Sequence, residues 1–133
     1  MGDVRRRISV PAHLSPPPVR LLLSKVIIVT VPSEVTEATE DDLLDALSQA
    51  SAIGARIIIL DCSGLLHINS YGIGLLMMLF TQARRRGQWL SAYGLNERHE
   101  KVFALTRLSE GIPIFPCQSD ALTAADSAKS ARS

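Results

Sequence analysis

Short apolar runs alternate with longer amphipathic segments along most of this chain. The short runs are rich in β-branched residues and are bounded by glycine or polar residues, a pattern typical of strands in a buried sheet. In the longer segments the apolar residues recur at helical spacing. The pattern predicts strands at 19–23, 26–31, 56–61, 89–93 and 112–115, and helices at 39–54, 70–86, 97–108 and from 119 onward.

This alternation predicts an α/β fold with a mixed, mostly parallel sheet covered by helices. Only Ser24 and Lys25 separate the first two strands, so we expect them to form an antiparallel hairpin that opens the domain. The two ends of the chain differ from the middle in composition. We therefore divide the chain into a flexible, Arg- and Pro-rich arm at 1–18, one domain at 19–126 and a flexible tail at 127–133.

The composition fits one globular domain, because 47% of the 133 residues are hydrophobic and 20% are charged. The net charge of +1 gives no electrostatic reason to expect direct binding to nucleic acid or to an anionic membrane. The longest apolar run, 73–80, is far shorter than the ~20 residues of a membrane span. Cys62 and Cys117 are expected to be buried or half-buried free thiols, which suits the cytoplasm.

The most informative segment, 61–74, leads from a buried strand into a helix, and Ser70 lies where that helix begins. A serine there is expected to cap the first turn with its hydroxyl. A phosphate on the same hydroxyl would lie at the positive end of the helix dipole. Two interpretations follow from the local sequence. Ser70 is either a plain helix cap worth about 1 kcal/mol or a position that carries a phosphate.

The same segment resembles the STAS family, named for sulfate transporters and anti-sigma-factor antagonists. The family's hallmark is a strand ending in Asp-Leu-Ser-Gly-Val, a short apolar loop, and then Asp-Ser-Ser-Gly-Leu-Gly entering a helix. The corresponding residues here are Asp61-Cys62-Ser63-Gly64-Leu65 and Asn69-Ser70-Tyr71-Gly72-Ile73-Gly74. The resemblance continues through 87–94 and 102–108 and covers roughly residues 19–125. It implies a STAS-like fold in which the opening hairpin adds an edge to the sheet.

The resemblance also implies a function. An anti-sigma-factor antagonist binds an anti-sigma factor, which is also a serine kinase with a histidine-kinase-like ATPase fold, and thereby frees a sigma factor for transcription. Ser70 stands at the family's phosphorylated serine. Phosphorylation there would end the complex, since a phosphate adds about −1.5 to −2 charges.

Three positions differ from the family pattern. Asn69 replaces the Asp before the serine, Tyr71 replaces a Ser or Thr, and Thr36 replaces an Asp in an earlier segment. The usual acids near the switch are therefore missing from their positions. Phosphate transfer could then be slow or need a kinase of altered specificity, or Ser70 could stay unmodified and bind constitutively. With Gly72, which shapes the same loop, these three residues are expected to contact the partner.

The helix after Ser70 is apolar on two sides. Ile73, Leu76, Met77 and Phe80 form one stripe, which we expect to face the core. The opposite side carries Leu75, Met78 and Leu79. Either this helix is buried on both faces, or these three residues form an apolar patch that contacts a partner.

The sequence gives little support for catalysis, a metal or a cofactor. His13, His67 and His99 are expected in the arm, in a loop and in a surface helix, without the spacing of a metal site. A hydrolase using Ser70 and His67 would need Gly-x-Ser-x-Gly, and its first glycine is absent. The main alternative to a switch is a non-switching STAS scaffold subunit of a stress-signalling assembly, or a soluble accessory of a transporter. Self-association as a homo-oligomer stays open.

Overall fold

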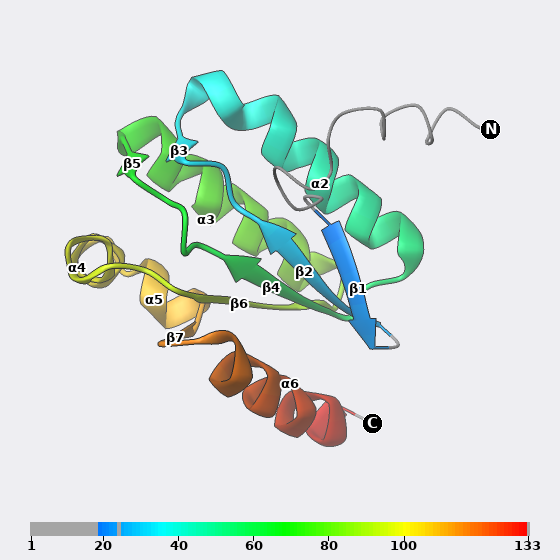
Figure 1. Cartoon of the computed structure of the whole chain (residues 1–133). Coiled ribbons are helices and arrows are strands. Elements are labelled where there is room, and N and C mark those ends of the chain that lie inside the picture. The colour runs from blue at the N-terminus through cyan, green and yellow to red at the C-terminus, as the bar shows by residue number, and fades with distance from the viewer. Residues whose placement is uncertain (1–18, 24, 133) are drawn as a thin grey trace.

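The computed structural model describes residues 19–23 and 25–132 of the chain (Figure 1). The predicted arm at 1–18 lies outside the described residues. The strands of the main sheet are β1 (Val19–Leu23), β2 (Val26–Thr30), β4 (Ile57–Asp61), β6 (Trp89–Tyr93) and β7 (Ile114–Phe115), in the order β1-β2-β4-β6-β7. β1 pairs antiparallel with β2, and every other pair is parallel. The predicted α/β fold with an opening hairpin is therefore confirmed.

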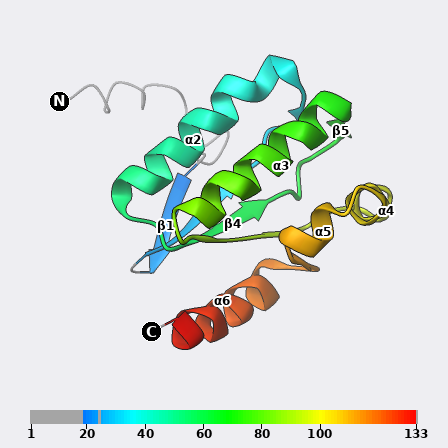
Figure 2. The same ribbon diagram turned by 180° about the vertical axis from the view of Figure 1, so that it is seen from behind.

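Helices cover both faces of this sheet, as the two opposite views in Figures 1 and 2 show. One face packs against α2 (Glu40–Ile53) and α3 (Ser70–Arg85), and the other against α6 (Gln118–Arg132). Alternate residues of the central strands supply the two cores. Ile27 and Ile58 lie in the first core, whereas Ile28 and Ile57 lie in the second. This two-sided burial explains why β2 and β4 are continuous apolar runs instead of alternating ones.

Two further strands of two residues each form a small separate sheet. β3 (Glu34–Val35) pairs in parallel with β5 (His67–Ile68), with Glu34 opposite His67 and Val35 opposite Ile68. The pattern analysis predicted neither strand. Their pairing carries the segment after β2 to the start of α3, where a single turn of 3-10 helix, η1 (Glu37–Thr39), leads into α2.

The end of the domain differs in detail from the prediction. The helix expected at 97–108 is split into α4 (Glu97–Leu105) and α5 (Leu108–Gly111), because Arg107 adopts a left-handed conformation with φ of 67°. The strand expected at 112–115 is shorter, since Ile112 is a buried core residue that ends α5. α6 continues to Arg132, past Asp126, where we placed the end of the domain.

Candidate functional site

Ser70 is the first residue of α3, and the start of α3 lies close to the small sheet and to the start of α2 (Figure 1). The small sheet holds these segments together. The backbone amides of Leu66 and His67 both donate to the carbonyl oxygen of Ser33, at 2.7 and 3.1 Å. As a result, the residues that follow β3 lie beside the residues that follow β5.

Asn69, and not Ser70, caps α3. Asn69 has an extended backbone, and its Oδ1 accepts a hydrogen bond from the backbone amide of Gly72 at 2.9 Å. Ser70 is the first residue of the helix, so the prediction that Ser70 caps the first turn was wrong. Its side chain is exposed, and its hydroxyl makes no hydrogen bond within the described part of the chain. Ser70 is therefore free to react at its hydroxyl without loss of a cap.

Two glutamates border the Ser70 loop. Asn69 Nδ2 donates to Glu37 Oε1 at 3.0 Å, and this hydrogen bond lowers the pKa of Glu37. The phenol of Tyr71 donates to Glu40 Oε1 at 2.6 Å, and this bond to a carboxylate raises the pKa of Tyr71. Sequence analysis missed both glutamates, because they lie 32 and 31 residues from their partners. The site thus has carboxylates nearby, although the family's own acid positions hold Asn69 and Thr36.

A shallow pocket of about 300 Å³ lies beside Ser70. Ser70 and Glu40 line it together with Tyr71 and Met78, whose side chains are 48% and 37% exposed. Met77, the neighbour of Met78 on α3, is 41% exposed. An exposed hydroxyl is therefore surrounded by apolar groups that a partner could cover and by carboxylates that a partner must accommodate.

The predicted core stripe of α3 is confirmed in part, because Leu76 is buried and Ile73 and Phe80 pack half-buried against the core, whereas Met77 is exposed. The buried residues are Gly72, Leu75, Leu76, Leu79 and Ala83, which follow each other at helical spacing along one face. Leu75 is 4% exposed and Leu79 is 2% exposed, so both side chains pack mainly in the core, although Leu75 also lines the pocket beside Ser70. Of the three predicted contact residues on this helix, Met78 alone is exposed.

Gly72 and Thr36 are also structural and do not lie on the surface. Gly72 is buried where α3 meets β3, and a Cβ there would collide with the carbonyl oxygen of Val35. Thr36 is 6% exposed, and its Oγ1 caps η1 by accepting from the amide of Ala38 at 3.1 Å. Their prediction as direct partner contacts was wrong, because both side-chain positions are enclosed by the chain itself.

The remaining polar candidates lie elsewhere. His99 was expected on the surface but is 2% exposed, with Nδ1 unpaired among the described residues, and burial lowers its pKa. Burial also raises the pKa of the Cys62 thiol to about 12, whereas Cys117 is exposed, contrary to prediction. Within the described ranges, no group of three or more His, Cys, Asp or Glu side chains could hold a metal ion.

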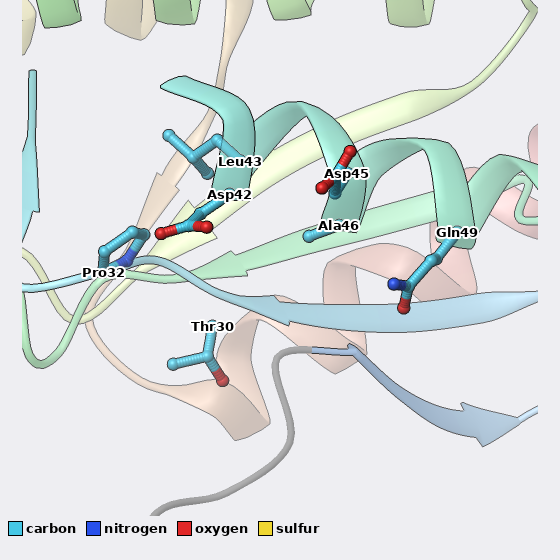
Figure 3. Close-up of a pocket in the computed structure, with 7 residues that line it drawn as sticks. All are labelled: Thr30, Pro32, Asp42, Leu43, Asp45, Ala46 and Gln49. Carbon is cyan, nitrogen blue, oxygen red and sulfur yellow. The ribbon is translucent and has the colours of Figure 1, made fainter. Parts of the chain in front are cut away.

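A second hollow, of about 380 Å³, lies between α2 and the end of β2 (Figure 3). Gln49 points from α2 towards β2 in this view, and Asp42 and Asp45 come from the same helix. Among the described residues, its lining contains neither Ser70 nor any residue of the Ser70 loop, and no basic side chain that would bind a phosphate. The pocket beside Ser70 is the better candidate site.

Comparison with models of known protein families identifies the family of this chain. The model of the STAS domain matches residues 21–121, which is most of the chain. The chain belongs to the STAS domain family. STAS domains of the anti-sigma-factor antagonist type are non-enzymatic binding modules. No curated protein matches the sequence at a significant level.

Solved structures with this STAS fold include both regulators and a transporter. An anti-sigma factor antagonist from Mycobacterium paratuberculosis is 23% identical, with a TM-score of 0.68, over 80% of this chain and 89% of that one. The Bacillus cell fate determinant SpoIIAA, in its phosphorylated form, is 15% identical with a TM-score of 0.62, over 80% of this chain and 96% of that one. The murine anion transporter Slc26a9 is 19% identical with a TM-score of 0.69, over 80% of this chain but 18% of the transporter. At these identities the similarity establishes the fold.

Among the described residues, no helix is both long and apolar enough to span a lipid bilayer.

Proposed function

We propose that this STAS protein is a cytoplasmic anti-sigma-factor antagonist that binds an anti-sigma factor with a histidine-kinase-like ATPase fold and is switched by phosphorylation of Ser70. The observation that carries the proposal is the position of Ser70. Its exposed hydroxyl makes no hydrogen bond in the described structure and lines a pocket at the first turn of α3. The similarity to an anti-sigma factor antagonist and to SpoIIAA, which was solved in a phosphorylated form, supports this use of the site.

In the phosphorylation reaction this chain supplies only the serine hydroxyl. The Ser70 oxygen attacks the γ-phosphorus of ATP held by the kinase, the bond to the ADP oxygen breaks, and a base of the kinase takes the hydroxyl proton. The product carries about −1.5 to −2 charges at the start of α3, where the backbone amides of the first turn favour an anion.

The same charge would weaken binding. Glu37 and Glu40 already place carboxylates beside the loop, so a phosphate adds to a local negative charge. A partner that packs against Tyr71, Met77 and Met78 would have to remove this phosphate from water, which is costly without a matching cation. Phosphorylation would therefore release the partner without unfolding the domain.

The test is a pull-down from native lysate with four proteins: wild type, Ser70→Ala, Ser70→Asp and Ser48→Asp. Ser48 is exposed in the middle of α2, so the last variant adds the same charge away from the site. We expect the wild-type, Ser70→Ala and Ser48→Asp proteins to retain a histidine-kinase-like ATPase that Ser70→Asp loses. With ATP, the retained ATPase should phosphorylate wild type and Ser48→Asp but not Ser70→Ala.

Retention of the same partner by Ser70→Asp and wild type would contradict the switch. The similarity to part of an anion transporter suggests how that result would be interpreted. If the retained partners are other STAS chains or a transporter, the chain is a scaffold or accessory subunit. Native mass measurement of the purified chain would then show whether it also assembles with itself.

A further inference from the structure

Glu37 and Glu40 meet the Ser70 loop on both sides of the serine. Glu37 of η1 is bonded to residue 69 and Glu40 of α2 to residue 71, so Ser70 lies between these two contacts along the chain. Neither glutamate forms an ion pair with a cation of the described residues. Among the side chains that the structure describes, the hydrogen-bond donors to these two carboxylates at the loop are Asn69 and Tyr71.

The hydrogen bond from Asn69 to Glu37 explains why position 69 holds an asparagine and not the aspartate of the STAS pattern. The Asn69 amide uses its oxygen to cap Gly72 and its nitrogen to bind Glu37. An aspartate, the residue of the STAS pattern, could still cap the helix, but its second oxygen would face the Glu37 carboxylate at hydrogen-bond distance. Two such carboxylates repel each other. Asn69 therefore suits a neighbour that is already negative.

The second contact depends on side-chain length. A Ser or Thr at position 71, as in the STAS pattern, is too short to span the distance that the Tyr71 ring covers to reach Glu40. The Tyr71 ring also lines the pocket beside Ser70. The bond to Glu40 consequently fixes one wall of the pocket.

We propose that Glu37 and Glu40 are positioning residues for Ser70. Each is matched to one residue that differs from the STAS pattern beside the serine: Glu37 accepts a hydrogen bond from Asn69, and Glu40 accepts one from Tyr71. The loop then keeps carboxylates next to Ser70, supplied by η1 and α2 instead of by the loop itself. The use of the positioned hydroxyl as a phosphoacceptor rests on the proposed function, whereas the matching of the two pairs does not.

Positioning has a direct consequence for the serine. With residue 69 held to η1 and residue 71 held to α2, the first turn of α3 is fixed while the Ser70 hydroxyl stays free. A kinase would receive this hydroxyl in one orientation, and small errors in such an orientation slow group transfer strongly.

The match between Asn69 and Glu37 can be tested in the full-length chain by exchanging the hydrogen-bond donor and acceptor of this pair. Asn69→Asp should place two carboxylates in contact, whereas Asn69→Asp with Glu37→Gln restores a hydrogen bond with the donor on the other side. The readout is hydrogen exchange of the amides of Gly72 and Ile73, which bond to the Oδ1 and backbone oxygen of residue 69. We expect about three- to tenfold faster exchange in the single variant, the effect of one hydrogen bond, and wild-type exchange in the double variant.

A matched control is available at the start of α4. Asn96 caps that helix in the same way, accepting from the amide of His99 at 2.8 Å, but its amide nitrogen meets no carboxylate of the described chain. Asn96→Asp should therefore leave the exchange of the first turn of α4 unchanged. Equal acceleration at both helices, or no rescue by Glu37→Gln, would overturn the matching.

The functional readout is the rate of Ser70 phosphorylation by the ATPase retained in the pull-down. Asn69→Asp should lower kcat about three- to tenfold with recovery in the double variant, and Tyr71→Phe should act similarly by leaving Glu40 without its donor. Unchanged kcat in both single variants would overturn the positioning role. If no variant, including wild type, is phosphorylated, the proposed function fails, while the exchange experiment still decides the matching.

Discussion

The centre of the sheet and the Ser70 site are held together by different forces. Along β2 and β4, Ile27, Ile28 and Ile58 are completely buried, and their side chains interact through apolar contact while their backbones pair in the sheet. Around Ser70, the half-buried Asn69 and the exposed Tyr71 bind glutamates from another part of the chain. The first region needs only apolar residues of the right size, whereas the second needs particular donors and acceptors. Substitutions should therefore affect stability mainly in the first region and interactions mainly in the second.

The largest effect on stability is expected in the sheet. Ile58→Ala removes three carbons from a site with no exposed surface and leaves a cavity, which should lower the free energy of unfolding by about 2–5 kcal/mol. Denaturant unfolding at equilibrium measures the loss. Leu66→Ala is the control, because Leu66 is 71% exposed and its truncation should change stability little. Similar losses in the two variants would contradict this contrast.

Two glycines in the first turns of α3 sharpen the comparison within the site. Gly72→Ala directs a methyl group into the backbone of Val35 and should cost about 1–3 kcal/mol of stability. Gly74→Ala meets no atom within 4 Å and should stabilise the helix by about 0.5–1 kcal/mol. Thermal unfolding of both variants checks the opposite signs. A stable Gly72→Ala protein would show that α3 is free to move away from β3.

A smaller effect separates the cap from the serine beside it. Asn69→Ala removes the cap of α3 and should cost about 1 kcal/mol. Ser70→Ala should change stability by less than about 0.5 kcal/mol, because the hydroxyl makes no hydrogen bond among the described residues. Both are measured by denaturant unfolding under the same conditions. The opposite order would return the capping role to Ser70.

The smallest expected effect is a dependence of stability on pH at His99. Burial, and then the charges of Arg98 and His67, lower the pKa of His99 from 6.5 in the folded chain. Because the unfolded chain then binds the proton more tightly, the contribution of neutral His99 is fully present above about pH 6.5 and is lost as the pH falls through the folded-state pKa. Melting temperatures between pH 8 and pH 5 should fall more for wild type than for His99→Leu. Exposed His67 provides the control, and His67→Gln should retain most of the dependence.

The elements that the sequence predicts well are those fixed by burial. The strands at the centre of the sheet and the helices α2 and α3 follow from apolar runs and helical spacing, and their residues lie in the two cores. The phase of α3 was assigned only in part, because nearly every residue from Ile73 to Phe80 is apolar and periodicity carries little information there. The break at Arg107 was missed as well, since a left-handed arginine has no signature in the local sequence.

The candidate site divides in the same way. Ser70, Asn69 and Tyr71 were identified from a continuous motif, and the structure places them together at the start of α3. Glu37 and Glu40 could not be identified, because only the pairing of β3 with β5 brings them beside the loop. Strands of two residues are too short to leave a pattern, so the contacts that depend on them are accessible from the structure alone.

The contrast between the two cysteines has a practical use. A maleimide reacts with a thiolate, and Cys62, with a pKa of about 12 in a buried position, presents almost none at neutral pH. Cys117 is exposed at the turn before α6, on a different element from Ser70. The natural chain therefore accepts a single fluorescent dye at a defined position, without substitution, and the labelled protein can report the binding and release of a partner in solution.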